Sequence, residues 1–519
     1  MSKWKVGSGV VTIRIRGFRV LRLPAMLFAA VFLARCVYLP ALSESEAVTA
    51  LPPERSSTLA RQLDRDPQAT PRALLIDGPE EALTSRLHLI EAAEHSLDLQ
   101  YFIWQNDYTG ILLIEKLIQA ADRGVRVRAV VDDVRLIGLI DRVSALNQHP
   151  NIEVRIYNPF SVRFRFPFAA FQVAEFAIDG NRLNHRMHNK LLVADNQLAI
   201  LGGRNIGDDY FGFSDDWYFI DTDLLLSGSL VTELSDGFDV YWNSRWSYPV
   251  EAISRYSVVS HELESIRNRI HQRLAEFPEI SAKVADGDFT ETVRQLLDGH
   301  RLEAYQLLVD DPNVGWFDRP DSIAEELAAL TDQIESEVII VTPYLVPTSN
   351  LLDIGEQLIA RGVRISVLTN SLATNNHVSA HAAYSQFRAR IMEMGVELYE
   401  FRADARMVEN TRDADHTMHS KYILFDEDRV FVGSMNLDPR SLYLNTELGV
   451  MLQSRELAAA LRRSYAEMTR PENAYRLISA EDSIEWHSDQ QILTREPAKS
   501  RWQLFMFRLM QLLPLSSQL

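Results

Sequence analysis

Apolar residues recur at helical and strand spacings in alternating order along most of this chain. In the first half the pattern predicts helix and strand in turn, at 79–94, 96–104, 110–121 and 125–131. The second half repeats the same order, at 322–334, 338–341, 351–360 and 363–368. Because helices that alternate with strands are typical of a sheet covered by helices, the pattern predicts an α/β fold in which one unit occurs twice.

The polar residues support this duplication. The first copy of a motif consists of His188, Lys190, Asp195, Gly202 and Asn205, and the second of His419, Lys421, Asp426, Gly433 and Asn436. In each copy, Lys follows His by 2 positions, Asp by 7, Gly by 14 and Asn by 17. Two matching half-sites in one chain predict a single active site at a pseudo-twofold interface between two lobes.

The residue types in the two motifs suit phosphodiester chemistry. The lysines and asparagines can hold the nonbridging oxygens of a phosphodiester, whose negative charge grows in the transition state. One histidine can attack phosphorus to give a phosphohistidine, and the other can protonate the leaving oxygen. Since the lysines supply the positive charge, we expect no metal and no cofactor. We expect Asp195 and Asp426, although they belong to the motifs, to bond backbone groups and brace the loop.

Carboxylates usually keep such a histidine oriented and neutral. Asp-Thr-Asp-Leu at 221–224 and Asn-Thr-Glu-Leu at 445–448 follow the two motifs and match in sequence. This match predicts that Asp223 and Glu447 occupy the same place in each lobe. Together with Asn205 and Asn436, they are our candidates for binding or orienting groups at the phosphate.

The two motifs resemble those of the phospholipase D superfamily. Within it, residues 186–190 and 438–447 resemble the bacterial cardiolipin synthase branch, particularly its shorter type without two N-terminal transmembrane helices. The resemblance covers about 73–475 and implies two similar lobes, each a mostly parallel or mixed sheet flanked by helices. It implies that His188 is the nucleophile and that His419 is the general acid and base. Gly203 replaces a serine of the family pattern, which implies a weaker phosphate contact there.

The resemblance also implies a reaction, namely transfer of a phosphatidyl group from phosphatidylethanolamine or phosphatidylglycerol to phosphatidylglycerol, which gives cardiolipin. A hydrolase with the same site, either a phospholipase D or a nuclease, is the alternative, and a lipid-binding scaffold without activity is a third. The net charge of −18 disfavours a nucleic-acid partner. We therefore expect phospholipids and a membrane as partners, and the sequence leaves open whether a helper protein takes part.

The N-terminus has the pattern of a targeting segment. Residues 1–35 carry seven Lys or Arg and no acid, and residues 23–34 are an uncharged, mostly apolar run. Except for Arg35, the sequence before Cys36 resembles a lipoprotein processing box, so Cys36 is a candidate for lipidation, and an uncleaved anchor is the alternative. The charge pattern predicts attachment to the bacterial inner membrane with the catalytic body facing the periplasm.

Two further segments are candidates for lipid contact. Residues 160–171 are rich in phenylalanine, and the alternative is that these rings belong to the core. Residues 499–513 are basic and apolar without an acid, which is typical of an interfacial helix, and the alternative is a helix docked on the second lobe.

The pattern along the chain divides it into six segments. They are a signal or anchor segment (1–41), a linker (42–72), a first lobe (73–250), a helical connector (251–305), a second lobe (306–475) and a tail with an amphipathic helix (476–519).

Overall fold

The computed structural model describes residues 39–40, 42, 46–63, 70–136, 139–161, 168–253, 262–277, 289–313, 322–407, 414–480 and 483–513. Cys36 and the apolar run at 23–34 lie outside the described residues, as do 162–167 of the phenylalanine-rich segment. In the described part of the chain, no helix has the length and apolar character needed to cross a membrane.

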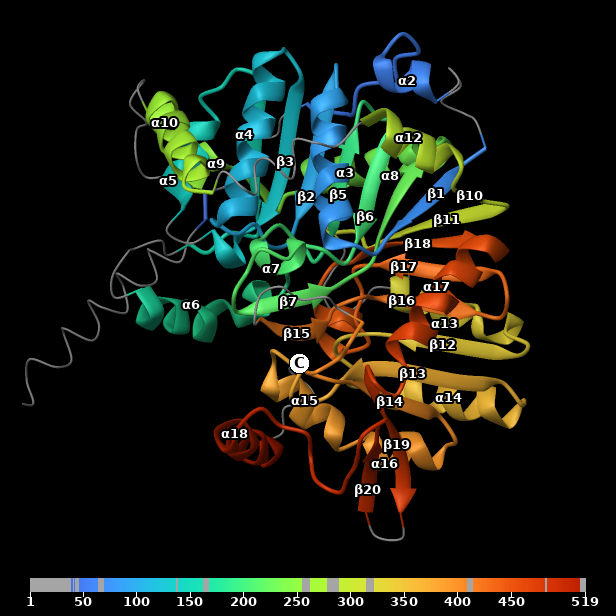
Figure 1. Cartoon of the computed structure of the whole chain (residues 1–519). Helices are drawn as coiled ribbons and strands as arrows, with labels where there is room; N and C mark the ends of the chain where they lie inside the picture. The colour runs from blue at the N-terminus through green and yellow to red at the C-terminus, as the bar shows by residue number, and fades with distance from the viewer. Residues whose placement is uncertain are drawn as a thin grey trace, which may run out of the picture.

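Two mixed sheets, one above the other in Figure 1, form the two lobes. The first sheet has the strand order β10-β1-β8-β6-β5-β2-β3-β4-β9. Its strands are β1 (Arg72–Ile76), β2 (Ser96–Tyr101), β3 (Arg126–Asp132), β4 (Ile152–Tyr157), β5 (Lys190–Ala194), β6 (Leu198–Gly202), β8 (Asp223–Ser227), β9 (Ser247–Pro249) and β10 (His300–Arg301). Strands β2, β3 and β4 are parallel, and the other pairings are antiparallel.

The second sheet repeats this plan in the order β11-β18-β17-β16-β12-β13-β14-β19-β20-β21. Its strands are β11 (Ala304–Val309), β12 (Glu337–Val341), β13 (Arg364–Asn370), β14 (Glu397–Phe401), β16 (Tyr422–Phe425), β17 (Arg429–Gly433), β18 (Leu448–Gln453), β19 (Ala474–Ala480), β20 (Ser483–His487) and β21 (Ile492–Leu493). Strands β12, β13 and β14 are again the parallel ones. The predicted duplication is therefore confirmed for eight consecutive strands of each sheet, and β10, β20 and β21 are additions at the edges.

Helices cover the outer face of each sheet. On the first lobe they are α3 (Pro79–Ala92), α4 (Tyr108–Asp122), α5 (Ile140–Leu146), α9 (Val250–Ile253), α10 (Glu262–Ala275) and α12 (Phe289–Leu297). On the second lobe they are α13 (Ile323–Ala329), α14 (Ser349–Ala360) and α16 (Arg388–Glu393), with a 3₁₀ turn at Thr331–Gln333. Each outer core consists of one face of the sheet and the apolar stripes of these helices.

A third apolar cluster joins the lobes. It combines the inner faces of both sheets with α8 (Ser229–Trp242) and α17 (Arg455–Met468). Side chains alternate along each strand, so Leu192 points to the outer core while Leu191 and Val193 point to this inner one. A two-stranded ribbon of β7 (Trp217–Ile220) and β15 (Asp415–Met418) also crosses the interface between the lobes.

Three predicted segment boundaries differ from the structure. Much of the predicted linker is bound to the first lobe: α2 (Thr58–Gln62) lies in it, and the Ala50 backbone N–H donates to Asp239 at 2.6 Å. In the described residues of the predicted connector, α10 and α12 pack on the first lobe and β10 joins its sheet. The tail begins as strands β19 to β21 of the second sheet, and only then forms α18 (Arg501–Gln511).

The remaining elements lie near the interface between the lobes. They are a 3₁₀ turn (Asp133–Arg135), α6 (Phe168–Leu183), α7 (Asp208–Phe211), α15 (Val378–Ser385) and a π-helical turn (Arg440–Leu444). In Figure 1, α6 and α18 lie on the left side of the molecule, α6 at about the level of β7 and α18 below the β7–β15 ribbon.

Candidate active site

Each motif histidine is fixed at the interface by a strand end of the opposite lobe. The backbone N–H of His419, which follows β15, donates to the carbonyl of Ile220 at the end of β7, at 2.7 Å. In the mirrored contact, the backbone N–H of His188 donates to the carbonyl of Thr446 at 2.8 Å. The two motifs therefore meet across the pseudo-twofold interface, as their repetition predicts.

A carboxylate from the opposite lobe holds each imidazole ring. Nδ1 of His188 lies 2.9 Å from Glu447 Oε2, and Nδ1 of His419 lies 2.5 Å from Asp221 Oδ2. Both carboxylates are fully buried. Since Nδ1 is engaged in each ring, Nε2 is the nitrogen available for chemistry in both.

The predicted equivalence of Asp223 and Glu447 is wrong. The Asp223 carboxylate instead pairs with Arg86 at 2.8 Å and Arg204 at 3.3 Å, all three side chains being buried. Asp223 therefore serves as the centre of a buried ion-pair network in the first lobe. It does not orient a motif histidine.

The backbone hydrogen bonds give the correct correspondence. Gly203 N donates to Thr222 O, and in the second lobe Ser434 N donates to Leu448 O, so Thr222 corresponds to Leu448 and Asp221 to Glu447. The predicted alignment of residues 221–224 with residues 445–448 is therefore two residues out of register. A displacement of two preserves the face of a strand, which is why the alternation pattern did not expose it.

Gly203 and Ser434 complete this correspondence. A Cβ at position 203 would lie 2.0 Å from Asp221 Oδ1, so only glycine leaves room for this carboxylate. In the second lobe the Ser434 hydroxyl donates to Glu447 at 2.5 Å. The serine hydroxyl thus supports a carboxylate, and the structure gives no reason to expect a weaker phosphate contact at Gly203.

The two motif lysines place buried positive charge at the interface. Each ammonium donates to the backbone carbonyl of its own motif histidine, and Lys421 Nζ also lies 2.8 Å from His419 Nδ1. Burial, with a smaller contribution from nearby Lys421, outweighs Glu447 and lowers the pKa of Lys190 to about 7. Burial likewise lowers the pKa of Lys421 to about 8. A bound anion would relieve this desolvation and repulsion, so the pair favours a negatively charged ligand.

The histidines are neutral near pH 7 in the free protein. Burial lowers the pKa of His188 to about 4, and Lys190 contributes in the same direction against Glu447. Burial and Lys421 lower the pKa of His419 to about 3. For Glu447, burial would raise the pKa, but His188 and Lys190 outweigh it and lower the value. A neutral imidazole next to an ionised carboxylate is the state that a nucleophile or a general base needs.

The two motif asparagines have different surroundings. Asn205 accepts a hydrogen bond from the backbone of Ile103 at 3.1 Å and donates to the Tyr210 hydroxyl at 2.8 Å. Asn436 is also buried, but its Oδ1 has no hydrogen-bond partner among the residues that the structure describes. Asn205 is therefore committed to the first lobe, and of the two predicted phosphate contacts Asn436 is the better candidate.

The motif aspartates have the bracing role predicted for them. Asp195 accepts hydrogen bonds from the backbone N–H groups of residues 94, 95 and 96, at 2.8–2.9 Å. Asp426 accepts from those of residues 335, 336 and 337. Both adopt left-handed backbone conformations, with φ of 50° and 52°. Each aspartate connects the end of its own strand to the start of the neighbouring one, at the edge of the sheet away from the histidines. Neither aspartate therefore contacts the reacting groups.

Sequence reasoning missed Asp221 and the aromatic rings beside the histidines. Phe219 stacks on His419 with ring centroids 5.3 Å apart, and Phe102 meets His188 edge-on at 4.9 Å. Asp221 was detectable, since it stands in the same Asp-Thr-Asp run on the same strand face as Asp223. The phenylalanines carry no sequence signal that separates them from core residues.

Among the described residues, one group has the geometry of metal ligands: His381, Glu400 and Glu496. It contains no motif residue. Arg388 pairs with both carboxylates at 2.9 Å, so a guanidinium already supplies the positive charge there. This group therefore gives no support for a metal centre.

Comparison with known proteins agrees with this geometry. A family model described as "Cardiolipin synthase, PLD-like domain" matches residues 87–242 and 327–469, and the chain belongs to this family. The protein is thus a phosphatidyltransferase of the phospholipase D superfamily, similar to cardiolipin synthases.

Individual relatives fit this class. "Cardiolipin synthase C" of Escherichia coli (strain K12) is 34% identical over 457 residues, which are 84% of this chain and 93% of that protein. "Cardiolipin synthase 1" of Bacillus cereus is 24% identical over 399 residues, 77% of this chain and 66% of that protein. The crystal structure of a phosphatidylserine synthase from Haemophilus influenzae Rd KW20 covers 81% of this chain and 92% of that one, with a TM-score of 0.53 at 14% identity. That last likeness concerns the fold.

Proposed function

We propose that the protein synthesises cardiolipin by transferring a phosphatidyl group from phosphatidylethanolamine or phosphatidylglycerol to phosphatidylglycerol. The observation that carries the proposal is the pair of neutral histidines, each held by a carboxylate of the opposite lobe, beside two buried lysines. The relatives named as cardiolipin synthases support the choice of product.

In the first step, His188 Nε2 attacks phosphorus and the bond from phosphorus to the leaving headgroup oxygen breaks. His419 Nε2 donates a proton to that oxygen, which leaves as an alcohol, ethanolamine or glycerol. Burial and Lys421 hold the pKa of His419 low in the free protein, so the ring takes up this proton when the anionic phosphate binds beside Lys190 and Lys421 and raises that pKa. The lysines stabilise the charge that develops on the nonbridging oxygens.

In the second step, His419 accepts the proton of a phosphatidylglycerol hydroxyl, and that oxygen attacks phosphorus. The phosphorus–nitrogen bond to His188 breaks, which gives cardiolipin and restores the neutral ring. The assignment of His188 as nucleophile rests on the resemblance to the superfamily, because the contacts of the two rings mirror one another.

The setting that we propose is the bacterial inner membrane, with the catalytic body on the periplasmic side. The basic and apolar N-terminus supports attachment, through lipidation of Cys36 or through an uncleaved anchor. Helix α18 supports a second contact, because Trp502, Phe505 and Leu512 are 68%, 54% and 80% exposed.

The phosphohistidine can be tested by trapping it. Phosphate-labelled phosphatidylglycerol is mixed with the protein, the reaction is quenched with base, and label on the chain is mapped by mass spectrometry. We expect label on His188 in the wild type, none in His188→Ala, and accumulated label in His419→Ala when the donor has a good leaving group. His271→Ala, which changes a histidine outside both motifs, is the control and should behave as wild type.

Label in His188→Ala but not in His419→Ala would exchange the two roles. An active wild type that never carries label would show direct displacement and contradict the covalent mechanism.

A further inference from the structure

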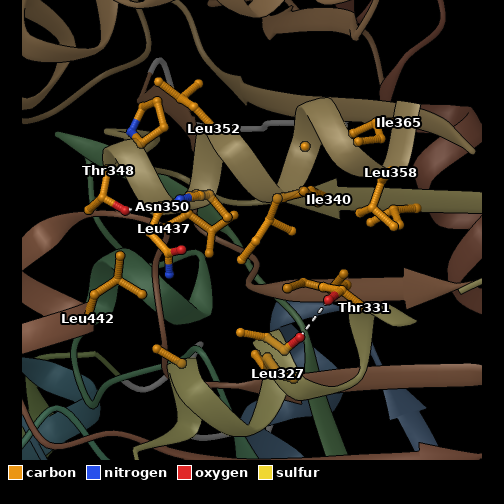
Figure 2. Close-up of a pocket in the computed structure, with 18 of the residues that line it drawn as sticks. Leu327, Thr331, Ile340, Thr348, Asn350, Leu352, Leu358, Ile365, Leu437 and Leu442 are labelled. Atoms are coloured by element: carbon orange, nitrogen blue, oxygen red, sulfur yellow. Dashed lines mark hydrogen bonds between the residues drawn. The ribbon is translucent and has the colours of Figure 1, made fainter. Parts of the chain in front are cut away.

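A large apolar cavity lies in the second lobe, between the outer face of the sheet and helices α13 and α14 (Figure 2). Its volume is about 510 Å³, within the range of roughly 300–1,000 Å³ typical of ligand pockets. Most of its wall is aliphatic, for example Leu327, Ile340, Leu352, Leu358 and Ile365. Polar groups such as those of Thr348 and Asn350 also line it.

The cavity is one residue away from the candidate active site. Met435 and Leu437 line it, and the residue between them is the motif residue Asn436. Leu345, which forms a bridge with Leu437, lines it too. Because consecutive side chains of an extended segment point to opposite sides, this backbone separates the phosphate site from the cavity.

The corresponding place in the first lobe, between α3 and α4, is filled, and the apolar cavity of that lobe lies on the other side of α4, against α5 and α10. There the bridge between Trp104 and Ile206 corresponds to that between Leu345 and Leu437. After it, α7 packs against both α3 and α4, with Tyr210 and Phe211 buried. The two lobes therefore open at different places, and the gap between the two helices that correspond to α13 and α14 is closed by α7 in the first lobe.

In the second lobe, no helix is inserted between α13 and α14 at this point of the described chain. The π-helical turn Arg440–Leu444 follows the motif instead, and its Leu442 and Tyr443 line the cavity. Tyr443 is 52% exposed, so the cavity is bordered by an aromatic ring that also faces solvent. The opening is therefore a feature of the lobe that carries Asn436 and Lys421.

We propose that this cavity holds one fatty-acyl chain of the phospholipid whose phosphate lies between the two lysines, an inference that rests on the proposed function. A phospholipid has an anionic phosphate and apolar acyl chains, and the cationic site and the aliphatic cavity match these two parts. We take an acyl chain as the occupant because each methylene group transferred from water to such a wall strengthens binding roughly fourfold. Binding of the acyl chain in the cavity also positions the phosphate relative to His188, because the acyl chain and the phosphate belong to one lipid molecule.

The first test narrows the cavity. Ala328 of α13 lines it, whereas its neighbour Ala329 is exposed and does not, so Ala328→Phe and Ala329→Phe form a matched pair. We expect Ala328→Phe to lower kcat/KM for long-chain phosphatidylglycerol by about tenfold or more, the equivalent of two or more lost methylene contacts. Turnover of a soluble analogue with butanoyl chains should stay within about twofold of wild type. Equal effects on both substrates, or no effect on either, would overturn the inference.

The second test does not depend on turnover. Phosphatidylglycerol with a photoreactive diazirine at a chain end is added in detergent micelles to His188→Ala protein, which is then irradiated and mapped by mass spectrometry. We expect adducts on α13 and α14, lost with Ala328→Phe and kept with Ala329→Phe. Adducts only on α18, or only in the first-lobe cavity beside α4, α5 and α10, would overturn the inference.

The two tests separate this inference from the proposed function. If adducts form in the cavity but the protein makes no cardiolipin, the acyl-chain site stands and the proposed function is wrong. If the protein makes cardiolipin without adducts in the cavity, and Ala328→Phe shows no dependence on chain length, the proposed function stands and the acyl-chain site is wrong.

Discussion

At the residue scale, the histidine–carboxylate pairs connect the fold to the chemistry. Each ring takes its partner from the other lobe, so neither lobe alone contains an oriented histidine. Asp221 and Asp223 stand two positions apart on one strand face but have unlike roles. Asp221 contacts a reactive ring, and Asp223 neutralises two buried arginines.

This distinction predicts opposite phenotypes for two similar variants. Asp221→Asn should lower kcat by on the order of 10³-fold with little change in melting temperature, since removing the carboxylate of a catalytic triad lowers kcat by about 10⁴. Asp223→Asn should lower the free energy of unfolding by about 3–5 kcal/mol, because it leaves buried arginines without a counter-charge. Calorimetry and initial rates measure the two effects. If Asp223→Asn proved stable but inactive, the assignment would be reversed.

The pH dependence of kcat, which reports the enzyme with lipid bound, follows from which groups must be neutral and which must be protonated. His188 must be neutral to attack, so activity is present above its pKa of about 4 and is lost as pH falls through that value. The lysines must be protonated to hold phosphate, so activity is present below their pKa values of about 7 and 8 and is lost as pH rises through them. His419 must carry a proton to act as the acid, and bound phosphate raises its low pKa, so this group adds to the loss at high pH and we expect kcat to decline above about pH 7. Activity undiminished at pH 9 would contradict protonated lysines as phosphate ligands.

Much of this site could be predicted from the sequence, since the motif repeats at identical spacing. The bracing aspartates also follow from their position after a buried strand. The partner of His419 could not be predicted with certainty, because Asp221 and Asp223 share a strand face and only hydrogen-bond register separates them. The unequal surroundings of the two asparagines arise from Tyr210, whose approach to Asn205 depends on the tertiary fold.

At the element scale, α18 is docked on the second lobe and leaves apolar side chains exposed on its other side. Phe507 is buried against α15, so the helix is docked on the second lobe. On its other side Trp502, Phe505 and Leu509 are exposed, as an interfacial helix requires. Lys499, just before the helix, pairs with Asp415 at 2.5 Å and lies 4.0 Å from the Trp217 ring centroid, at the β7–β15 ribbon.

We therefore expect Trp502→Ser, Phe505→Ser and Leu509→Ser together to weaken binding to anionic vesicles by more than about tenfold, since each large apolar side chain buried contributes about 1.5–3 kcal/mol. The melting temperature should remain unchanged, because these side chains contribute little to the packed face. Phe507→Ser is the contrasting variant and should lower the melting temperature. Vesicle sedimentation with protein lacking the N-terminal anchor segment measures the binding, and equal binding by wild type and the triple variant would refute an interfacial α18.

Periodicity predicted these elements well and their ends less well. The helices predicted at 79–94 and 351–360 are α3 and α14, whereas the helix predicted at 322–334 ends at Ala329 and continues as a 3₁₀ turn. In the first lobe α7 follows Asn205, and the alternation of apolar residues does not predict its packing against α3 and α4.

At the scale of the whole molecule, the duplication explains why one site needs both lobes. The apolar cluster between the sheets fixes the lobes against each other, and the β7–β15 ribbon and the Met187–Thr446 bridge place the motifs on either side of the pseudo-twofold axis. Two lobes were predictable from the repeat. The bound segment at 46–63 was not, because many of its contacts are hydrogen bonds of its backbone to first-lobe side chains, and its few buried residues, such as Leu59, form no periodic pattern.

The most direct test of the account is the product that the purified protein makes. Vesicles of phosphatidylglycerol, with and without phosphatidylethanolamine, are incubated with wild-type and His188→Ala protein in the presence of EDTA, and the lipids are quantified by mass spectrometry. We predict cardiolipin as the main product of the wild type and phosphatidic acid as a minor one. The reason is that a bound and oriented glycerol hydroxyl can reach an effective molarity of about 10⁵ M, which lets it outcompete water. His188→Ala should give neither. Phosphatidic acid as almost the sole product at high phosphatidylglycerol, or activity that EDTA abolishes and one metal restores, would contradict the account.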